Sequence, residues 1–285
     1  MTGWTWQTGS VISSGEGIYW ELSGEHGEVV VLTHGAGGSH AVWFQQVPEL
    51  VAAGYRVLTW DSRGFGKSTF RSGSLGAVEA AADLGVVLDN LDSLGLLNAD
   101  DPVHLVGQSM GGWYVTEFAI ANPDRIRSLA LCDTIGSVYT DELRQVLADF
   151  RARGGLGGGG APRGGTLLAA SEADETTAFL YQQLGTFHSP PLEEVGRVLA
   201  GAEHAPSEVS ALGVPVLVLA GDRDPIFPPG PLKNMASLIS GSTWVEIADA
   251  GHSPYFEQPA AFNAALLTFL GSATPGSAAL GPDTD

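Results

Sequence analysis

Short apolar runs alternate along most of the chain with segments whose apolar residues recur at a helical spacing. Val29–Thr33 is almost entirely apolar, which is typical of a strand buried on both faces. Within Leu75–Leu94, apolar residues such as Leu84, Val87 and Leu91 fall on one face of a helix. This alternation predicts an α/β fold built on a mostly parallel sheet.

The individual elements follow from the same pattern. The predicted strands are Thr5–Ser13, Ile18–Ser23, Val29–Thr33, Tyr55–Trp60, Val103–Val106, Ile126–Cys132, Val214–Ala220 and Trp244–Ile247. Helices are predicted at Ala41–Ala53, Leu75–Leu94, Pro231–Ile239 and Ala260–Leu270, and another follows Gly111. The first two strands have no helix between them, so we expect them to pair antiparallel. Residues 272–285 are small and polar with Pro and Gly, which predicts a mobile tail.

The alternation breaks between strands Ile126–Cys132 and Val214–Ala220. About eighty residues there contain no convincing strand, which is too long for a plain loop. Helices are predicted near Asp141–Arg153, Glu175–Leu184 and Leu192–Ala200, with a glycine-dense segment at Gly154–Gly165. We therefore expect a helical cap at residues 134–213, inserted into a core formed by 1–133 and 214–271. A disordered insertion is the alternative, which aromatic residues such as Phe179 disfavour.

Charge and composition limit the classes of molecule that the protein is expected to bind. The formal net charge is −19, which disfavours nucleic acid and anionic lipid because both are negatively charged. No apolar run approaches the ~18 residues that span a membrane, and the first residues do not resemble a secretory signal. The single cysteine, Cys132, cannot form an internal disulfide. We expect a cytoplasmic protein with a small-molecule substrate and leave the oligomeric state open, a homodimer included.

The segment Gly107-Gln108-Ser109-Met110-Gly111 joins strand Val103–Val106 to a predicted helix. G-x-S-x-G at such a junction predicts a strained turn that exposes a serine hydroxyl at the top of the sheet. That hydroxyl becomes a nucleophile when a base takes its proton and a third group orients the base. His252 follows the last strand and falls on the same edge of the sheet, so we predict it as the base.

The orienting acid is expected between the serine and the histidine in chain order. Asp224, in the turn after strand Val214–Ala220, is our prediction, with Asp222 forming the turn itself. Asp133 competes for the role because it ends strand Ile126–Cys132 and projects toward the same edge.

An acyl-transfer serine also needs donors for the developing oxyanion. The N–H of Met110, at a helix N-terminus, is one predicted donor. The glycine loop His34-Gly35-Ala36-Gly37-Gly38 is expected to supply the second from Ala36. A phosphate-binding loop is the alternative, but the loop has neither a G-x-G-x-x-G nor a G-K-[ST] pattern.

Five motifs occur in order and together span the chain apart from the cap and tail. They are His34-Gly35 with its glycine loop, Asp61-x-Arg63-Gly64-x-Gly66-x-Ser68, the Ser109 turn, Gly221-Asp222-x-Asp224 and Gly251-His252. In this set the chain resembles the α/β-hydrolase superfamily, in its esterase, lactonase and carbon–carbon bond hydrolase branch. The resemblance implies an eight-stranded sheet with helices on both faces, and a structural role for the Asp61 motif. The residues around His252 also resemble those of enol-lactone hydrolases and cofactor-independent perhydrolases.

We therefore predict a serine hydrolase of small carboxylic esters or lactones, with Ser109, Asp224 and His252 as its triad. No cofactor is needed, and no His, Cys or Asp cluster has metal-ligand spacing. Two alternatives stay open: hydrolysis of a carbon–carbon bond in a diketone-like or ring-cleavage product, and a ligand receptor with very slow turnover. Core packing explains Trp113 as well as substrate binding does. The candidates for the substrate pocket are Gly35, Trp113, Phe150 and Phe187.

Overall fold

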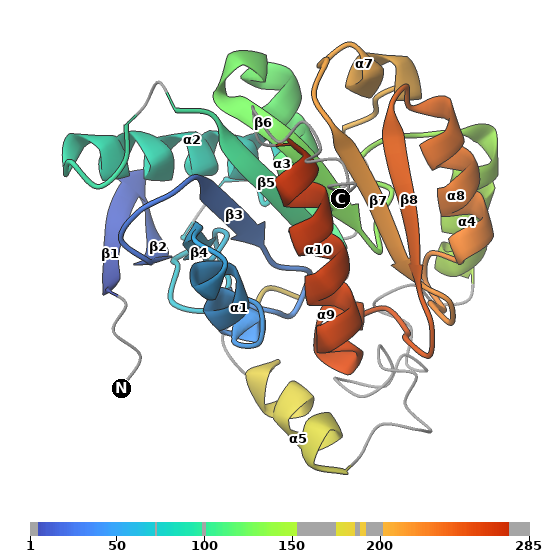
Figure 1. Cartoon of the computed structure of the whole chain (residues 1–285), viewed down its shortest axis with the longest axis horizontal. Helices are drawn as coiled ribbons and strands as arrows, with labels where there is room; N and C mark the ends of the chain where they lie inside the picture. Colours follow the sequence, from blue (N-terminus) through green and yellow to red (C-terminus); the bar gives the residue numbers. More distant parts are fainter. Residues whose placement is uncertain are drawn as a thin grey trace, which may run out of the picture.

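The computed structural model describes residues 5–71, 73–98, 101–152, 175–185, 189–191 and 202–273. An eight-stranded sheet in the order β1-β2-β4-β3-β5-β6-β7-β8 forms its centre (Figure 1). The strands are β1 (Trp6–Ser13), β2 (Glu16–Ser23), β3 (Val29–Thr33), β4 (Arg56–Trp60), β5 (Val103–Gln108), β6 (Ile126–Cys132), β7 (Val216–Gly221) and β8 (Ser242–Ile247). β1 pairs antiparallel with β2, as does β2 with β4, and the other pairs are parallel. The predicted fold class and the antiparallel lead-in are confirmed.

The order of the strands creates a switch point in the middle of the sheet. From β3 the chain moves outward to β4, and it then crosses back to β5 on the other side of β3. Connections that leave β3 and β5 in opposite directions leave room for a ligand beyond the carboxyl ends of these strands. Both strands are buried along their whole length. The part of the carboxyl edge that can hold a site therefore lies at the middle strands of the sheet.

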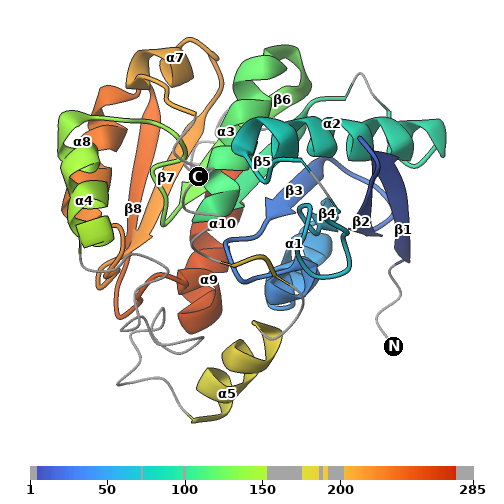
Figure 2. The same ribbon diagram turned by 180° about the vertical axis from the view of Figure 1, so that it is seen from behind.

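Helices cover both faces of the sheet (Figures 1 and 2). α1 (Val47–Ala52) and α10 (Pro259–Ala273) pack on one face, where α10 buries Phe262, Leu266 and Phe269 at a helical spacing. α2 (Ala77–Ser93), α3 (Met110–Ala121) and α8 (Pro229–Leu238) pack on the other face. Because burial of one such large side chain is worth roughly 1.5–3 kcal/mol, these apolar stripes fix the helices to the sheet.

The predicted helix Ala41–Ala53 is wrong as a single element. A 3₁₀ turn spans His40–Trp43, and α1 begins only at Val47. Pro48 explains the break because it has no N–H to donate and its ring would clash with the carbonyl of Phe44 in a continuous helix.

Three other helical segments differ from the expectation. The short helices α7 (Pro206–Ser210) and α9 (Pro254–Glu257) were not expected, and both begin at a proline, which suits the first helical position. α10 extends to Ala273, into the predicted tail, of which residues 274–285 lie outside the described ones. No helix within the described ranges is long and apolar enough to cross a membrane.

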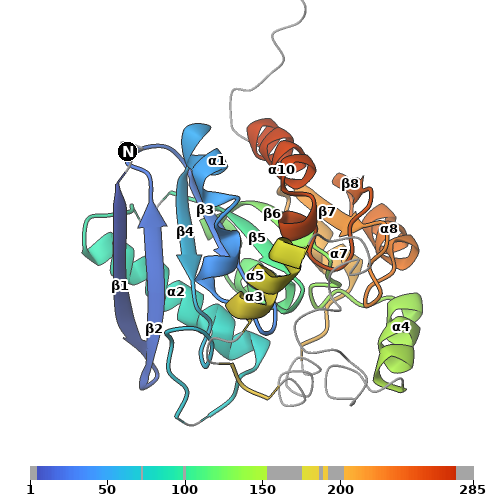
Figure 3. The same cartoon turned by 90° about the horizontal axis from the view of Figure 1, so that it is seen from below.

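Two helices lie between β6 and β7, in the segment predicted as a cap. α4 (Asp141–Ala152) packs beside α8, and α5 (Glu175–Leu184) lies beyond the carboxyl edge of the sheet (Figures 1 and 3). The predicted helix Leu192–Ala200 and the segment Gly154–Gly165 fall outside the described residues. The cap at 134–213 therefore stays a prediction.

Candidate active site

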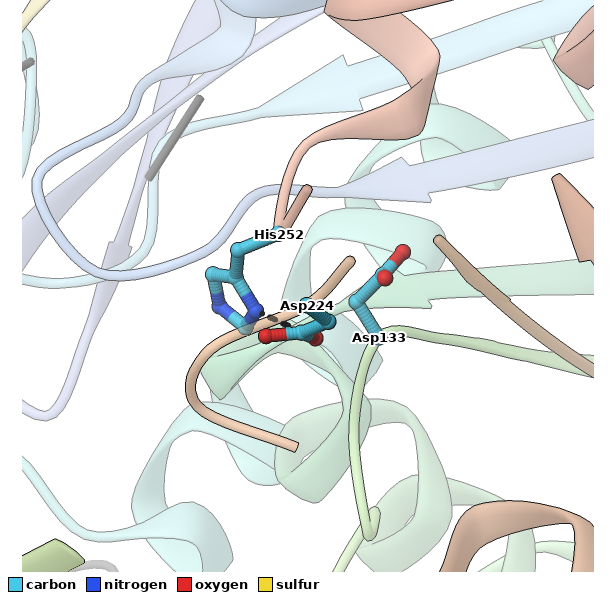
Figure 4. A group of neighbouring side chains, drawn as sticks. All are labelled: Asp133, Asp224 and His252. Atoms are coloured by element: carbon cyan, nitrogen blue, oxygen red, sulfur yellow. Dashed lines mark hydrogen bonds and ion pairs between the residues drawn. The ribbon is translucent and has the colours of Figure 1, made fainter. Parts of the chain in front are cut away.

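The residues predicted to carry chemistry come from loops at one edge of the sheet. β3, β5, β6, β7 and β8 are parallel, so their carboxyl ends lie along the same edge. His34 follows β3, Ser109 follows β5 and Asp133 follows β6, while Asp224 and His252 lie in the loops after β7 and β8. Figure 4 shows three of these side chains, Asp133, Asp224 and His252, coming together from three different loops.

Ser109 lies in a strained turn between β5 and α3. Its backbone has φ 48° and ψ −120°, a region that non-glycine residues rarely adopt, and such a residue costs about 1–3 kcal/mol. The turn is held by its neighbours: the Ser109 N–H donates to the Cys132 carbonyl at 3.0 Å, and Thr134 Oγ1 donates to the Ser109 carbonyl at 2.7 Å. In this turn Ser109 is partly exposed, between buried neighbours.

The glycines around Ser109 are required by close backbone approach. A Cβ on Gly107 would lie 2.6 Å from the carbonyl oxygen of Gly111, and a Cβ on Gly111 would lie 2.7 Å from that of His34. Gly112, outside the five-residue motif, would meet the side chain of Thr134 in the same way. Since real Cβ atoms do not come this close, the motif is needed to pack α3 against β3 and β5.

His252 and Asp224 form a buried hydrogen-bonded pair. His252 Nδ1 lies 2.8 Å from Asp224 Oδ2, so Nδ1 carries the proton when the carboxylate is ionised. The other oxygen of Asp224 accepts the N–H groups of Ile226 at 2.7 Å and Phe227 at 3.1 Å. Three donors thus hold the Asp224 carboxylate in place. His252 Nε2 accepts no hydrogen bond from any residue within the described ranges.

The Ser109 turn and the His252 loop are joined through Gln108. Its Nε2 donates to the carbonyl oxygen of His252 at 2.8 Å, which ties β5 to the loop after β8. Within the described part of the chain, the Ser109 hydroxyl and the imidazole form no direct hydrogen bond. Contacts of this kind are often long without substrate and tighten when it binds.

The glycine loop after β3 is arranged by His34. Burial lowers the pKa of His34 and outweighs the opposing charge of Asp61, so the ring is neutral at pH 7. Its Nδ1–H donates to the Gly35 carbonyl at 2.8 Å, while Nε2 accepts the Ser62 N–H at 3.2 Å. A Cβ on Gly35 would lie 3.1 Å from the Ser109 Cβ, so this loop borders the serine directly.

Two backbone donors at this point have no acceptor in the part of the chain that the structure describes. They are the N–H groups of Ala36, in the glycine loop, and Met110, the first residue of α3. An N–H at the first position of a helix also carries the positive end of the helix dipole. Both groups are therefore available to an anionic oxygen.

Asp133 lies beside the His252–Asp224 pair rather than in place of Asp224. Its Oδ1 accepts the Gly221 N–H at 2.9 Å, and it is fully buried. Ligand atoms of Asp133, Asp224 and His252 lie within 4.8 Å of one another, a proximity that sequence spacing cannot reveal. Most of the carboxylate oxygens already accept protein N–H groups, so we interpret the cluster as a hydrogen-bonded group rather than a metal site.

The predicted pocket residues fall into different surroundings. Gly35 is buried beside Ser109, and Phe150 on α4 is half-buried against the core. Trp113 is only 4% exposed and belongs to the core, where its ring lies 6.0 Å from that of Phe227. Phe187 lies outside the described residues.

Two aromatic neighbours of the site were not singled out from the sequence. The ring of Phe227 lies 5.8 Å from that of His252. Tyr181 on α5 places its hydroxyl 2.9 Å from Ser253 Oγ, next to His252 in the chain. Phe227 lies close after Asp224 in sequence, which is the one signal that points to it.

Comparison with known proteins assigns the chain to a family. The model of the alpha/beta hydrolase fold matches residues 28–259, which is more than half of the chain. The chain belongs to this family. The resemblance stated from the five motifs is thereby confirmed.

Individual relatives agree with the family. The chain is 40% identical over 119 residues to 2-hydroxy-6-oxononadienedioate/2-hydroxy-6-oxononatrienedioate hydrolase 1 of Dechloromonas aromatica, covering 40% of this chain and 38% of that one. A thermophilic esterase from Thermogutta terrifontis matches with TM-score 0.74 and 29% identity, over 94% of this chain and 99% of that one. A bromoperoxidase from Bacillus anthracis matches with TM-score 0.73 and 26% identity, over 93% of this chain and 99% of that one. The predicted assignment of the chain to the hydrolases is supported at this level.

Proposed function

We propose that this α/β hydrolase cleaves a small carboxylic ester or lactone through an acyl-enzyme on Ser109. The observation that carries the proposal is the state of His252: Nδ1 is held by Asp224 at 2.8 Å, while Nε2 has no partner in the described part of the chain. An imidazole held in this way has its lone pair on Nε2 and can take a proton. The strained turn presents the Ser109 hydroxyl at the same edge.

The proposed reaction has two halves. Ser109 Oγ attacks the carbonyl carbon while His252 Nε2 takes the hydroxyl proton, and Asp224 stabilises the resulting imidazolium. The N–H groups of Met110 and Ala36 donate to the oxyanion, and His252 then gives its proton to the leaving alcohol. Water attacks the acyl-enzyme by the same route, which releases the acid and restores Ser109. No step requires a cofactor.

We propose that residues 134–213 act as a cap over this site. α5 supports this assignment because Tyr181 contacts Ser253 and Phe256, whose ring lies 5.0 Å from that of Tyr181. A helix in this position borders the His252 loop, so the cap would shape the substrate pocket and decide which acyl group fits.

Hydrolysis of a carbon–carbon bond is the second candidate. The 119-residue match to the Dechloromonas aromatica hydrolase supports it, since this is the most similar stretch by identity among the three relatives described. The same three side chains would serve, and the cap would select the substrate.

A substrate panel tests the proposal. Wild type and Ser109→Ala are assayed with short p-nitrophenyl esters, lactones and ring-cleavage products. We expect multiple turnovers of an ester or lactone, and a loss of at least ~10³-fold in kcat/KM in Ser109→Ala with an unchanged circular dichroism spectrum. Turnover of ring-cleavage products alone would favour the second candidate. Tight binding without product release would indicate a receptor and overturn the enzyme proposal.

A further inference from the structure

Asp133 is a buried acid that the proposed triad does not use. It follows β6 directly with φ 49°, in the left-handed region where aspartate is among the better tolerated residues. Its N–H donates to the Leu219 carbonyl at 2.8 Å, and its Oδ1 accepts the Gly221 N–H at 2.9 Å. These bonds tie β6 to β7, and none of them requires that the carboxyl group be ionised.

The second oxygen of Asp133 has no donor. Oδ2 is buried and accepts no hydrogen bond from any described residue. Both oxygens of the neighbouring Asp224 are occupied by N–H groups, from Ile226 and Phe227 on one side and from His252 on the other. Asp224 therefore has hydrogen-bond donors at both oxygens, which stabilise an ionised carboxylate. Asp133 has a donor at only one of its two oxygens within the described part of the chain.

Two ionised carboxylates in these positions would repel one another without water to screen them. The ligand atoms of Asp133, Asp224 and His252 lie within 4.8 Å of one another, and Figure 4 shows Asp133 beside Asp224. A proton on Asp133 removes the repulsion and turns its unpaired oxygen into a donor. Buried carboxyl pairs commonly share one proton for this reason.

We propose that Asp133 is a protonated carboxylic acid that donates its O–H to ionised Asp224, so that the pair carries one negative charge. Asp133 is then a positioning residue, which acts on His252 through Asp224. The same geometry makes Asp133 the acid that supports His252 when Asp224 is neutralised. The role toward His252 rests on the proposed function, whereas the protonation of Asp133 does not.

The surrounding charges agree with this state. Burial first, and then the negative charge of Asp224, raise the pKa of Asp133 well above its usual range, against the opposing Gly221 N–H. Glu257, whose carboxylate accepts the Gly251 and Ser253 N–H groups, adds a further negative charge. The titratable groups that face Asp133 are Asp224, His252, Glu257, Cys132, Tyr181 and Tyr255.

A melting series tests the protonation without any substrate. An aspartate in the unfolded chain ionises near its ordinary pKa of 3.8, whereas folded Asp133 keeps its proton above that pH. The stability that this group contributes is therefore full at low pH and is lost as pH rises above 3.8. Asp133→Asn imitates the protonated acid, so the difference in Tm between this variant and wild type should shift in favour of the variant from pH 4 to pH 8.

Asp222→Asn is the matched control for this series. Asp222 is an acid of the same turn as Asp224, and its Oδ1 accepts the Ala250 N–H at 3.2 Å. Its substitution should not produce a pH-dependent gain. If Asp133→Asn becomes progressively less stable than wild type as pH rises, Asp133 is ionised and the proposal is wrong.

Kinetics on the same variants test the positioning role. Asp133→Ala should lower kcat/KM by ~10-fold because Asp224 loses a hydrogen bond, and Asp133→Asn should recover most of that loss. Asp224→Asn should lose about 10³–10⁴-fold. Because Asp133 then supports His252, Asp224→Asn/Asp133→Asn should fall at least another ~10-fold.

Two results would overturn the positioning role. They are a loss in Asp133→Asn equal to that in Asp224→Asn, and a double variant no worse than Asp224→Asn. A wild type without Ser109-dependent turnover would instead overturn the proposed function. In that case the melting series still decides whether Asp133 holds its proton.

Discussion

Two histidine–carboxylate pairs lie at the carboxyl edge of the sheet, and they use their ring nitrogens differently. His252 Nδ1 lies 2.8 Å from Asp224, and His40 Nδ1 lies 2.9 Å from Asp61. His40 Nε2 is also engaged, at 3.2 Å from Glu21 Oε1. His252 Nε2 has no such partner in the described part of the chain. A carboxylate beside a histidine is therefore not enough to make a base.

The second carboxylate fixes the charge of His40. Burial alone would lower the pKa of His40, but hydrogen bonds to Asp61 and Glu21, and the charges of both, outweigh it and raise the pKa to about 9. Burial would likewise raise the pKa of Glu21, whereas hydrogen bonds with His40 and Tyr19 and the charge of His40 lower it to about 2. His40 is thus a cation at neutral pH and cannot accept a proton. It joins the 3₁₀ turn after the glycine loop to β2 and β4.

The largest expected effect separates the two histidines by activity. His252→Gln should lower kcat/KM by at least ~10³-fold with little change in Tm, because it removes the proposed base. His40→Gln should keep turnover within ~10-fold and lower Tm, because it breaks a structural ion pair. Steady-state kinetics and thermal melts of both variants check this. Equal losses of turnover in the two variants would contradict the assignment of His252 as the base and of His40 as a structural residue.

A smaller loss of activity is expected from a change in the glycine loop, which borders Ser109 and precedes the 3₁₀ turn of His40. Gly35→Ala places a Cβ 2.2 Å from Gln108 Oε1 and 3.1 Å from the Ser109 Cβ, so the loop and the Gln108 side chain must move apart. Displacement of an oxyanion donor costs about 10²–10³-fold in kcat, and we expect a loss of ~10–100-fold because the loop gives partly. Gly85→Ala, in α2, is the control, since its Cβ would meet only Phe118 at an ordinary 3.7 Å. Unchanged kcat in Gly35→Ala would remove this loop from the oxyanion site.

The smallest effect is a pH-dependent change in stability at His40. Its folded pKa of about 9 lies above the ordinary histidine pKa of 6.5, so its contribution to stability is full below pH 6.5 and is lost as pH rises through about 9. His40→Gln should therefore cost about 1–2 kcal/mol at pH 6, once solvent screening of this partly exposed group is discounted, and much less at pH 10. Denaturant melts at both pH values measure this.

His26→Gln is the control for the stability series. The His26 side chain is 94% exposed and should leave the free energy of unfolding nearly unchanged at either pH. A cost for His40→Gln that is the same at pH 6 and pH 10 would show that the His40 network acts through packing rather than charge.

The fold could be predicted from the sequence because each strand has its own local pattern of apolar residues. The central strands, such as β3, are apolar runs, and Ser109, Asp224 and His252 follow strands whose ends must meet in a parallel sheet. Chain order also ranked Asp224 above Asp133 as the acid that orients His252. In the structure, Asp224 is the acid that forms a hydrogen bond with His252 Nδ1. Local signals of this kind are sufficient to locate the edge, while the roles of these residues stay a prediction.

Contacts between segments that are far apart in the sequence leave no local pattern from which they could be predicted. The hydrogen bond from Gln108 to the His252 carbonyl joins residues 144 positions apart in the sequence. The hydrogen bond from Thr134 to the Ser109 carbonyl joins residues 25 positions apart. The proximity of the two aspartates is of the same kind, since they come from separate loops. Periodicity describes which face of an element is buried, but it does not describe which side chains meet across loops. The break at Pro48 was readable in principle, because proline opposes a continuous helix.

The central claim is that Ser109 forms a covalent acyl-enzyme with His252 as its base. The most direct measurement is mass spectrometry of the intact protein and its peptides, after rapid mixing with p-nitrophenyl acetate and acid quench. We predict one added acetyl group on the peptide that contains Ser109, formed in wild type, absent in Ser109→Ala and strongly slowed in His252→Gln. Ester turnover that continues in Ser109→Ala, or acetylation confined to another residue, would contradict the account.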